Sequence, residues 1–247
     1  GLIESGDMKY EEIAGCRACY LPELYEAETN AAENFARMCR RTFRDKANIA
    51  KLLTKLEAQQ GISYAPMQRQ TLELALKNQL LVITGGPGTG KTTSIRAILA
   101  MFDEIGIKTL LCAPTGRAAK RMTELTGRDA ATVHRMLGAK FDEDNDRVVF
   151  TKDESDRLDC DAVILDECSM VDICLMDALL RALPPDARLI MVGDADQLPS
   201  VGPGNVFSAL IRSQVVATVR LTEIFRQTGD SRIIRNAHMI NRGEHPD

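Results

Sequence analysis

Four short apolar runs, which alternate with helical stretches, constrain the fold of this chain more than any other feature. They lie at residues 80–84, 109–113, 162–166 and 189–193. Strands that are apolar throughout are typical of a parallel sheet covered by helices on both faces. The pattern therefore predicts an α/β fold in three layers, in which right-handed crossovers join the strands.

The sequence before the first of these runs is predicted to be mainly helical. Apolar residues recur at three-to-four spacing between Leu21 and Leu56, and the pattern stops at Gly61. A further amphipathic helix is expected from Met67 to about Leu76. One stretch breaks the later alternation, because residues 141–150 place an acidic turn between two apolar arms, which predicts a β-hairpin.

Composition excludes several classes of protein. The 247 residues are 45% hydrophobic and 27% charged, with no apolar run near the roughly 18 residues of a membrane span. Seven cysteines form no disulfide framework, and no signal peptide is visible, so a cytoplasmic protein with no membrane partner is expected. A net charge of −4 argues against a uniformly basic surface that binds nucleic acid, but it permits a local basic groove. The chain starts with Gly and has no obvious closing element, which indicates a fragment.

A phosphate-binding loop follows the first apolar run. The sequence Gly85-Gly86-Pro87-Gly88-Thr89-Gly90-Lys91-Thr92 matches the pattern of Gly, four residues, then Gly-Lys-Thr, between a predicted strand and a predicted helix. Glycines let backbone N–H groups close around phosphates, and the following helix adds a favourable dipole. Lys91 would reach the terminal phosphates of ATP, and Thr92 would bind Mg²⁺.

Two adjacent carboxylates end the third apolar run. Asp166 would hold Mg²⁺ through water, and Glu167 would act as the general base for an attacking water molecule. This pair favours nucleotide hydrolysis over kinase chemistry, which does not need to activate water. Gln197 follows the fourth run, where a side chain can contact both the γ-phosphate and the water.

Taken together, these motifs resemble the first motor domain of a superfamily-1 helicase of the RecD type. The resemblance covers roughly Ser63 to the end, with six motifs in family order at residues 85–93, 113–119, 131–135, 166–170, 192–201 and 221–227. It implies a RecA-like domain over 61–247, with a possible inserted hairpin at about 139–158. Residues 1–60 resemble the helical end of an amino-terminal region.

The resemblance also implies roles that spacing alone does not give. Gln68 would read the adenine, and Arg226 would touch the γ-phosphate, completing a catalytic set with Lys91, Glu167 and Gln197. The nucleotide would be bound by the phosphate loop through Gly86, Pro87, Gly88, Thr89, Gly90, Lys91, Thr92 and Thr93. The DNA backbone would be held by Pro114, Thr115, Gly116, Arg117, Thr132 and His134. His134 has the alternative of a buried core histidine, and the acidic turn of the hairpin would repel phosphates, which puts a strand-parting role in doubt.

The function implied is an ATP-dependent DNA helicase that moves 5′ to 3′ in DNA repair or recombination. Its partners would be single-stranded or duplex DNA, a second RecA-like domain of the parent chain and, in some relatives, subunits of a nuclease–helicase complex. The fragment would bind ATP and Mg²⁺ but would not unwind alone. Two alternatives stay open: a phosphate-loop ATPase motor that does not act on DNA, and a regulatory subunit that binds nucleotide without cleaving it.

Overall fold

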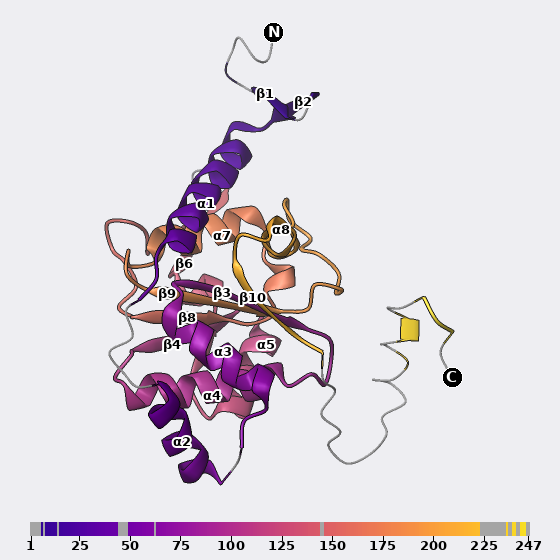
Figure 1. The fold of residues 1–247 in the computed structure, drawn as a ribbon. Helices are drawn as coiled ribbons and strands as arrows, with labels where there is room; N and C mark the ends of the chain where they lie inside the picture. The colour runs from indigo at the N-terminus through magenta and orange to yellow at the C-terminus, as the bar shows by residue number, and fades with distance from the viewer. Residues whose placement is uncertain are drawn as a thin grey trace.

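A parallel sheet forms the centre of the computed structural model, which describes residues 6, 8–13, 15–43, 49–61, 63–143, 146–222, 236, 239–240 and 243–245. Helices surround this sheet (Figure 1). Within the described residues it has six strands in the order β10-β3-β9-β8-β4-β5. Their bounds are β3 (Leu80–Gly85), β4 (Thr109–Ala113), β5 (Ala130–Thr132), β8 (Ala162–Leu165), β9 (Arg188–Gly193) and β10 (Ala217–Leu221). All neighbouring pairs run parallel, which confirms the predicted fold class.

The four predicted strands are the four central ones, β3, β9, β8 and β4. The sequence did not predict the edge strands β5 and β10. Both are less completely buried than the central strands, so they lack the continuous apolar run that marks a strand covered on both faces.

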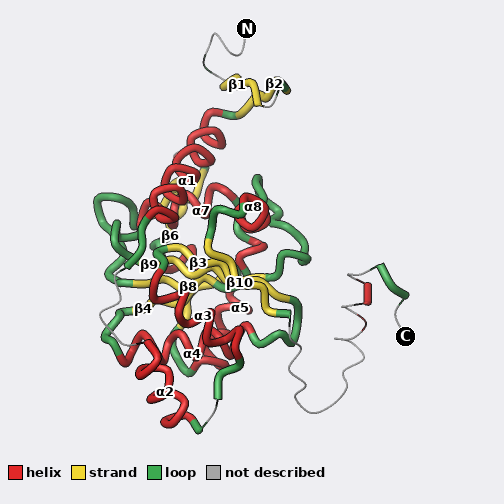
Figure 2. Tube along the Cα trace, in the orientation of Figure 1, coloured by secondary structure: helices red, strands yellow, loops and turns green. Residues whose placement is uncertain are grey.

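Helices cover both faces of the sheet (Figure 2). Side chains of the sheet and the helices form a separate hydrophobic core on each face. Alternate strand residues point to opposite faces, so Leu80 and Val82 pack in one core while Leu81 and Ile83 pack in the other. One face carries α1 (Pro22–Arg40), α7 (Ile173–Ala182) and α8 (Val206–Ser213). The other carries α2 (Ile49–Gln60), α3 (Pro66–Lys77), α4 (Lys91–Glu104) and α5 (Gly116–Thr126).

The amino-terminal part is less helical than the sequence predicts. An antiparallel pair, β1 (Lys9–Ile13) and β2 (Cys16–Tyr20), precedes α1 and projects from the body (Figure 1). Helix α1 ends at Arg40, and the chain that follows reaches the end of α3, where the N–H of Phe43 donates to the Lys77 carbonyl at 2.8 Å. The Arg188 guanidinium lies 3.8 Å from the centre of the Phe43 ring. This contact fastens the amino-terminal segment to the sheet.

Residues 139–142 and 147–150 pair as the antiparallel hairpin that the sequence predicts. Strand β6 (Ala139–Asp142) pairs with β7 (Arg147–Phe150), with Phe141 opposite Val148. The hairpin follows the short helix α6 (Val133–Met136), and η1 (Cys168–Met170) follows β8. Among the described residues, no helix combines the length and the apolar character needed to cross a membrane.

Candidate nucleotide and nucleic-acid site

The predicted site residues follow the carboxyl ends of neighbouring strands. Because the strands are parallel, these ends share one edge of the sheet, where open α/β sheets bind ligands. The phosphate loop follows β3, Asp194 follows β9, and Asp166 follows β8. Thr115 follows β4, and Thr132 ends β5. The edge thus carries the predicted nucleotide residues on three adjacent strands and the predicted DNA residues on the next two.

The phosphate loop is closed by its own atoms. The Thr89 hydroxyl donates to the Gly86 carbonyl at 2.8 Å, and Gly88 and Gly90 have φ values of 77° and 89°. These values lie in the left-handed region that favours glycine. At Gly85 the constraint is steric, because a Cβ atom there would lie 2.6 Å from the Thr89 Oγ1 and 2.7 Å from the Leu221 carbonyl oxygen. The loop therefore depends on close backbone approach.

The Lys91 ammonium is held by backbone carbonyls of the phosphate loop. Its Nζ donates to the Gly85 carbonyl at 2.5 Å and to the Gly86 carbonyl at 3.1 Å. Lys91 is also the first residue of helix α4, and the dipole at the amino terminus of this helix attracts negative charge. Neutral carbonyls hold an ammonium more weakly than phosphate oxygens do, so a bound phosphate could take the amine from them. Thr92 is partly exposed beside it.

The carboxylate of Asp166 is partly buried. Burial raises its pKa, while the charges of Lys91 and Arg121 act in the opposite direction. Its Oδ1 accepts the backbone N–H of Glu167 at 2.9 Å. Glu167 has a φ of 54°, and non-glycine residues in this region are uncommon and concentrate at functional sites. The structure thus sets Asp166 and Glu167 in a tight, strained turn at the end of β8.

Gln197 lies in the loop after β9 with an exposed side chain. Its backbone N–H donates to the Asp194 carbonyl at 3.2 Å, and the buried Asp194 carboxylate accepts the N–H of Asp196 at 3.1 Å. The Thr84 hydroxyl accepts the N–H of Ala195 at 3.3 Å. This last bond, which the sequence did not predict, ties the Gln197 loop to the strand that carries the phosphate loop.

Gln68 occupies a different place from the one its sequence position suggests. It is buried, with 8% of its surface exposed, although periodicity alone would put it on a helix surface. Its Oε1 accepts the N–H of Ala65 at 3.0 Å, which caps the start of α3. This capping role was not predicted from the sequence, although a Gln three residues after the cap is a signal for it. Arg226 lies outside the described residues.

The candidate DNA residues begin two helices. The Thr115 hydroxyl accepts the N–H of Ala118 at 3.2 Å at the start of α5, and the Thr132 hydroxyl accepts the N–H of Arg135 at 3.1 Å at the start of α6. Exposed backbone N–H groups at helix starts are suited to phosphates. Gly116 is exposed and Pro114 partly exposed. Exposed basic side chains on α5, α6 and β6 accompany them: Arg117, Lys120, Arg121, Arg135 and Lys140.

His134 is exposed, so its interpretation as a core histidine is wrong. Its ring lies 5.9 Å, centre to centre, from the ring of Phe150 on β7. The sequence predicts Phe150 in a hairpin arm but does not indicate its contact with His134. A contact between residues 16 positions apart depends on how the hairpin closes, and periodicity carries no such signal.

Known proteins resemble this chain over most of its length. Residues 68–203, more than half of the chain, match the profile of a family described as "AAA domain". The ATP-dependent RecD2 DNA helicase of Deinococcus radiodurans is 38% identical over 227 residues, covering 92% of this chain and 30% of that protein. The RecBCD enzyme subunit RecD of Mycobacterium tuberculosis is 40% identical over 167 residues, covering 58% of this chain and 28% of the relative.

A solved structure shares the fold. The crystal structure of Pif1 helicase from Candida albicans matches with a TM-score of 0.52 and 25% identity, covering 75% of this chain and 46% of that one. The similarity agrees with a RecA-like arrangement of sheet and helices. The chain spans less than a third of the length of the two RecD relatives described above.

Proposed function

We propose that this chain, which belongs to the AAA domain family and resembles RecD-type superfamily-1 helicases, is the first motor domain of an ATP-dependent DNA helicase. The parent would move 5′ to 3′ and act in DNA repair or recombination in the cytoplasm. One observation carries the proposal: nucleotide residues and candidate DNA residues occupy neighbouring strand ends at a single sheet edge. A motor requires such proximity, because ATP hydrolysis must change how tightly the protein binds the DNA.

The nucleotide half contains the groups that ATP hydrolysis needs. Glycine-rich backbone and the Lys91 ammonium suit the phosphates, and the partly buried Asp166 with Thr92 suits Mg²⁺, which would neutralise phosphate charge. Lys91 would exchange the Gly85 and Gly86 carbonyls for phosphate oxygens. Glu167 would take a proton from the attacking water. Gln197 would follow the state of the γ-phosphate from the exposed loop after β9.

The DNA half adjoins the carboxylates directly. Strand β8, which ends at Asp166, pairs with β4, which leads to Thr115, and the Asp166 N–H donates to the Cys112 carbonyl at 2.9 Å. A shift of Asp166 on nucleotide binding would therefore act on the strand that carries the DNA-facing turn. Thr115, Thr132 and their helix starts would hold phosphates, which positions the strand without reading sequence.

Arg226, which lies outside the described residues, would touch the γ-phosphate and complete the catalytic set. A second RecA-like domain of the parent would close the nucleotide site. Two apolar side chains in the loop after β9, Leu198 and Val201, are 86% and 107% exposed beside the nucleotide edge. Such exposed apolar groups fit a surface that another domain covers. The isolated chain would thus bind ATP, hydrolyse it slowly and not unwind, and the parent would act alone or within a nuclease complex.

The decisive experiment measures ATP turnover by the parent and by this chain, each with and without single-stranded DNA. We expect many-fold stimulation of the parent by DNA and little turnover by the chain. Glu167→Gln in the parent should lower turnover by about 10²–10⁴-fold while ATP still binds. Glu124→Gln, at an exposed position on α5, is the matched control and should leave turnover unchanged.

Two results would overturn the proposal. If DNA changes neither rate while ATP binds, the chain belongs to an ATPase motor that does not act on DNA. If Glu167→Gln leaves the rate unchanged, the chain is a nucleotide-binding regulatory module.

A further inference from the structure

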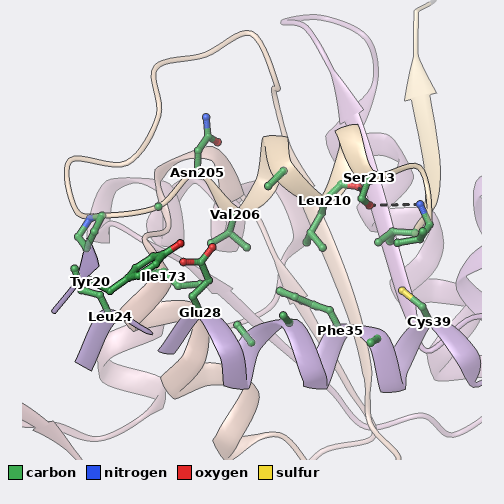
Figure 3. A pocket seen from close by; sticks show the side chains of 18 residues that line it. Tyr20, Leu24, Glu28, Phe35, Cys39, Ile173, Asn205, Val206, Leu210 and Ser213 are labelled. Atoms are coloured by element: carbon green, nitrogen blue, oxygen red, sulfur yellow. Dashed lines mark hydrogen bonds between the residues drawn. The ribbon is translucent and has the colours of Figure 1, made fainter. Parts of the chain in front are cut away.

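An apolar groove runs along α1 on the face of the sheet that also carries α7 and α8. Helix α1 forms one wall, and α8 with the loops before and after it forms the other (Figure 3). The volume is about 510 Å³. The phosphate loop and the candidate DNA residues do not line it. The groove is therefore separate from the site proposed above.

The lining is suited to an apolar helix rather than to a polar small molecule. Glu28 supplies the only charge among the 18 lining residues, and most of the others are aliphatic or aromatic. Small side chains form part of both walls, including Ala32 and Ala36 on α1 and Ala209 on α8. Small residues let a second helix approach within the 8–10 Å that helix packing requires. The lining residues of α1 run from Leu24 to Cys39, a stretch of helix about 24 Å long.

The end of the groove near Tyr20 is acidic. A second hollow of about 290 Å³ shares Tyr20, Glu28 and Ala32 with the groove and adds Glu11 and Glu33. Within the described part of the chain, Glu11, Glu28 and Glu33 form no ion pair with a basic side chain. An occupant that carries Lys or Arg at this end and an apolar face along α1 would therefore match both halves of the surface.

We propose that an amphipathic helix from another part of the same parent chain packs in this groove, with a basic residue near Glu28. The length of the relatives supports this source, because the chain covers 30% of the RecD2 helicase and 28% of the RecD subunit. Most of a parent of that length would lie outside this chain, and a segment covalently linked to the groove has a high effective concentration. The groove is then an interior contact of the parent.

Cys39 gives a direct test because its partly exposed thiol lines the groove. The exposed Cys16, Cys19 and Cys174 are changed to Ser. The reaction of Cys39 with N-ethylmaleimide is then followed by peptide mass spectrometry in this chain and in the longer parent. Each rate is divided by the rate in denaturant. We expect Cys39 to react at least about tenfold more slowly in the parent than in the chain, as a covered site does.

Two substitutions test whether the groove itself causes the protection. Ala36→Glu places a charge on the groove wall and should restore the reaction of Cys39 in the parent. Ala58→Glu, at an exposed position of α2 outside the groove, should leave the protection intact. A benzophenone maleimide on Cys39 of the parent should then crosslink to an amphipathic, basic segment of the same polypeptide.

Three results would overturn the proposal: equal Cys39 rates in the two proteins, protection that survives Ala36→Glu, or a crosslink to a second copy or to another protein. The measurement uses neither ATP nor DNA. Its failure would therefore leave the proposed helicase activity standing, and failure of the helicase test would leave the groove proposal standing.

Discussion

The phosphate loop and the hairpin region hold their functional side chains in different ways. In the loop, the bonds of Thr89 and Lys91 reach carbonyls at most six residues away. In the hairpin region, His134 contacts Phe150, and the N–H of Thr151 donates to the Leu137 carbonyl at 3.1 Å. These contacts span 14 to 16 residues. The first region is organised locally, and the second depends on the closure of a hairpin.

This difference has a consequence for mutations. A change in the phosphate loop should abolish nucleotide binding without altering the hairpin. A change at the hairpin base should weaken stability and DNA binding while nucleotide binding persists. Five substitutions, grouped in four predictions from the largest expected effect to the smallest, test whether the two regions are independent in this sense.

Gly85→Ala should have the largest effect. The added Cβ would meet the Thr89 Oγ1 and the Leu221 carbonyl oxygen, and the latter is backbone that cannot rotate away. We expect nucleotide affinity to fall by at least about 100-fold, equivalent to about 2.7 kcal/mol. Titration with a fluorescent ATP analogue measures this loss. Gly116→Ala is the control, since its Cβ would meet no described heavy atom within 4 Å; equal affinities for the two variants would contradict the prediction.

Gly138→Ala should destabilise the hairpin region by about 2 kcal/mol. Gly138 has a φ of 65°, and its Cβ would lie 2.0 Å from the Thr151 Oγ1. Gly138→Ala combines a steric clash with the cost of a positive φ, and Gly106→Ala is the control that separates them. Gly106 has a φ of 74° and open space around it, so only the backbone cost of about 1 kcal/mol remains. Urea unfolding measures both.

Removing the Thr151 side chain should relieve part of the Gly138→Ala effect. Gly138→Ala is introduced both into the unaltered protein and into the Thr151→Ala variant. In the Thr151→Ala variant it should lower the free energy of unfolding by less, close to the loss that Gly106→Ala causes. Purely additive losses would show that the two side chains do not clash.

The same difference explains what the sequence could predict. The four central strands and the phosphate loop are continuous patterns, so their residues indicate both the fold and the chemistry. Edge strand β5 has only partly buried residues, and the projecting β1 is exposed, so neither shows an apolar run. The burial of Gln68 and the contact of Phe150 with His134 arise from packing between distant segments. Sequence periodicity describes one element at a time and does not contain such contacts.

Phe150→Leu should weaken single-stranded DNA binding by about threefold to tenfold, or about 1 kcal/mol. Leucine keeps an apolar side chain at the hairpin base but removes the ring that contacts His134, so the imidazole loses its position. Fluorescence anisotropy of a labelled oligonucleotide on the parent measures the change, at a temperature where the variant is folded. Nucleotide affinity should stay at the value of the unaltered protein.

Two controls show whether the Phe150→Leu effect passes through His134. Val148→Ala, at an exposed position on the same strand, should leave DNA affinity unchanged. In a His134→Ala background, Phe150→Leu should cause no further loss, because the side chain it positions is gone. Equal losses with and without His134 would show that Phe150 acts on the hairpin alone.

Thr115→Ala and Thr132→Ala should have the smallest effects on stability. Each removes a hydroxyl that caps a helix, at the start of α5 and α6 respectively, and such caps contribute about 1 kcal/mol. Helix α5 has 11 residues and α6 has four, so loss of the α5 cap should lower the free energy of global unfolding more clearly. Thr→Ser at either position keeps the hydroxyl and should preserve both stability and DNA affinity. If Thr132→Ala, at the start of the helix that leads into the hairpin, lowered nucleotide affinity as Gly85→Ala does, the hairpin region and the phosphate loop would be coupled before any DNA binds, and the independence of the two regions would fail.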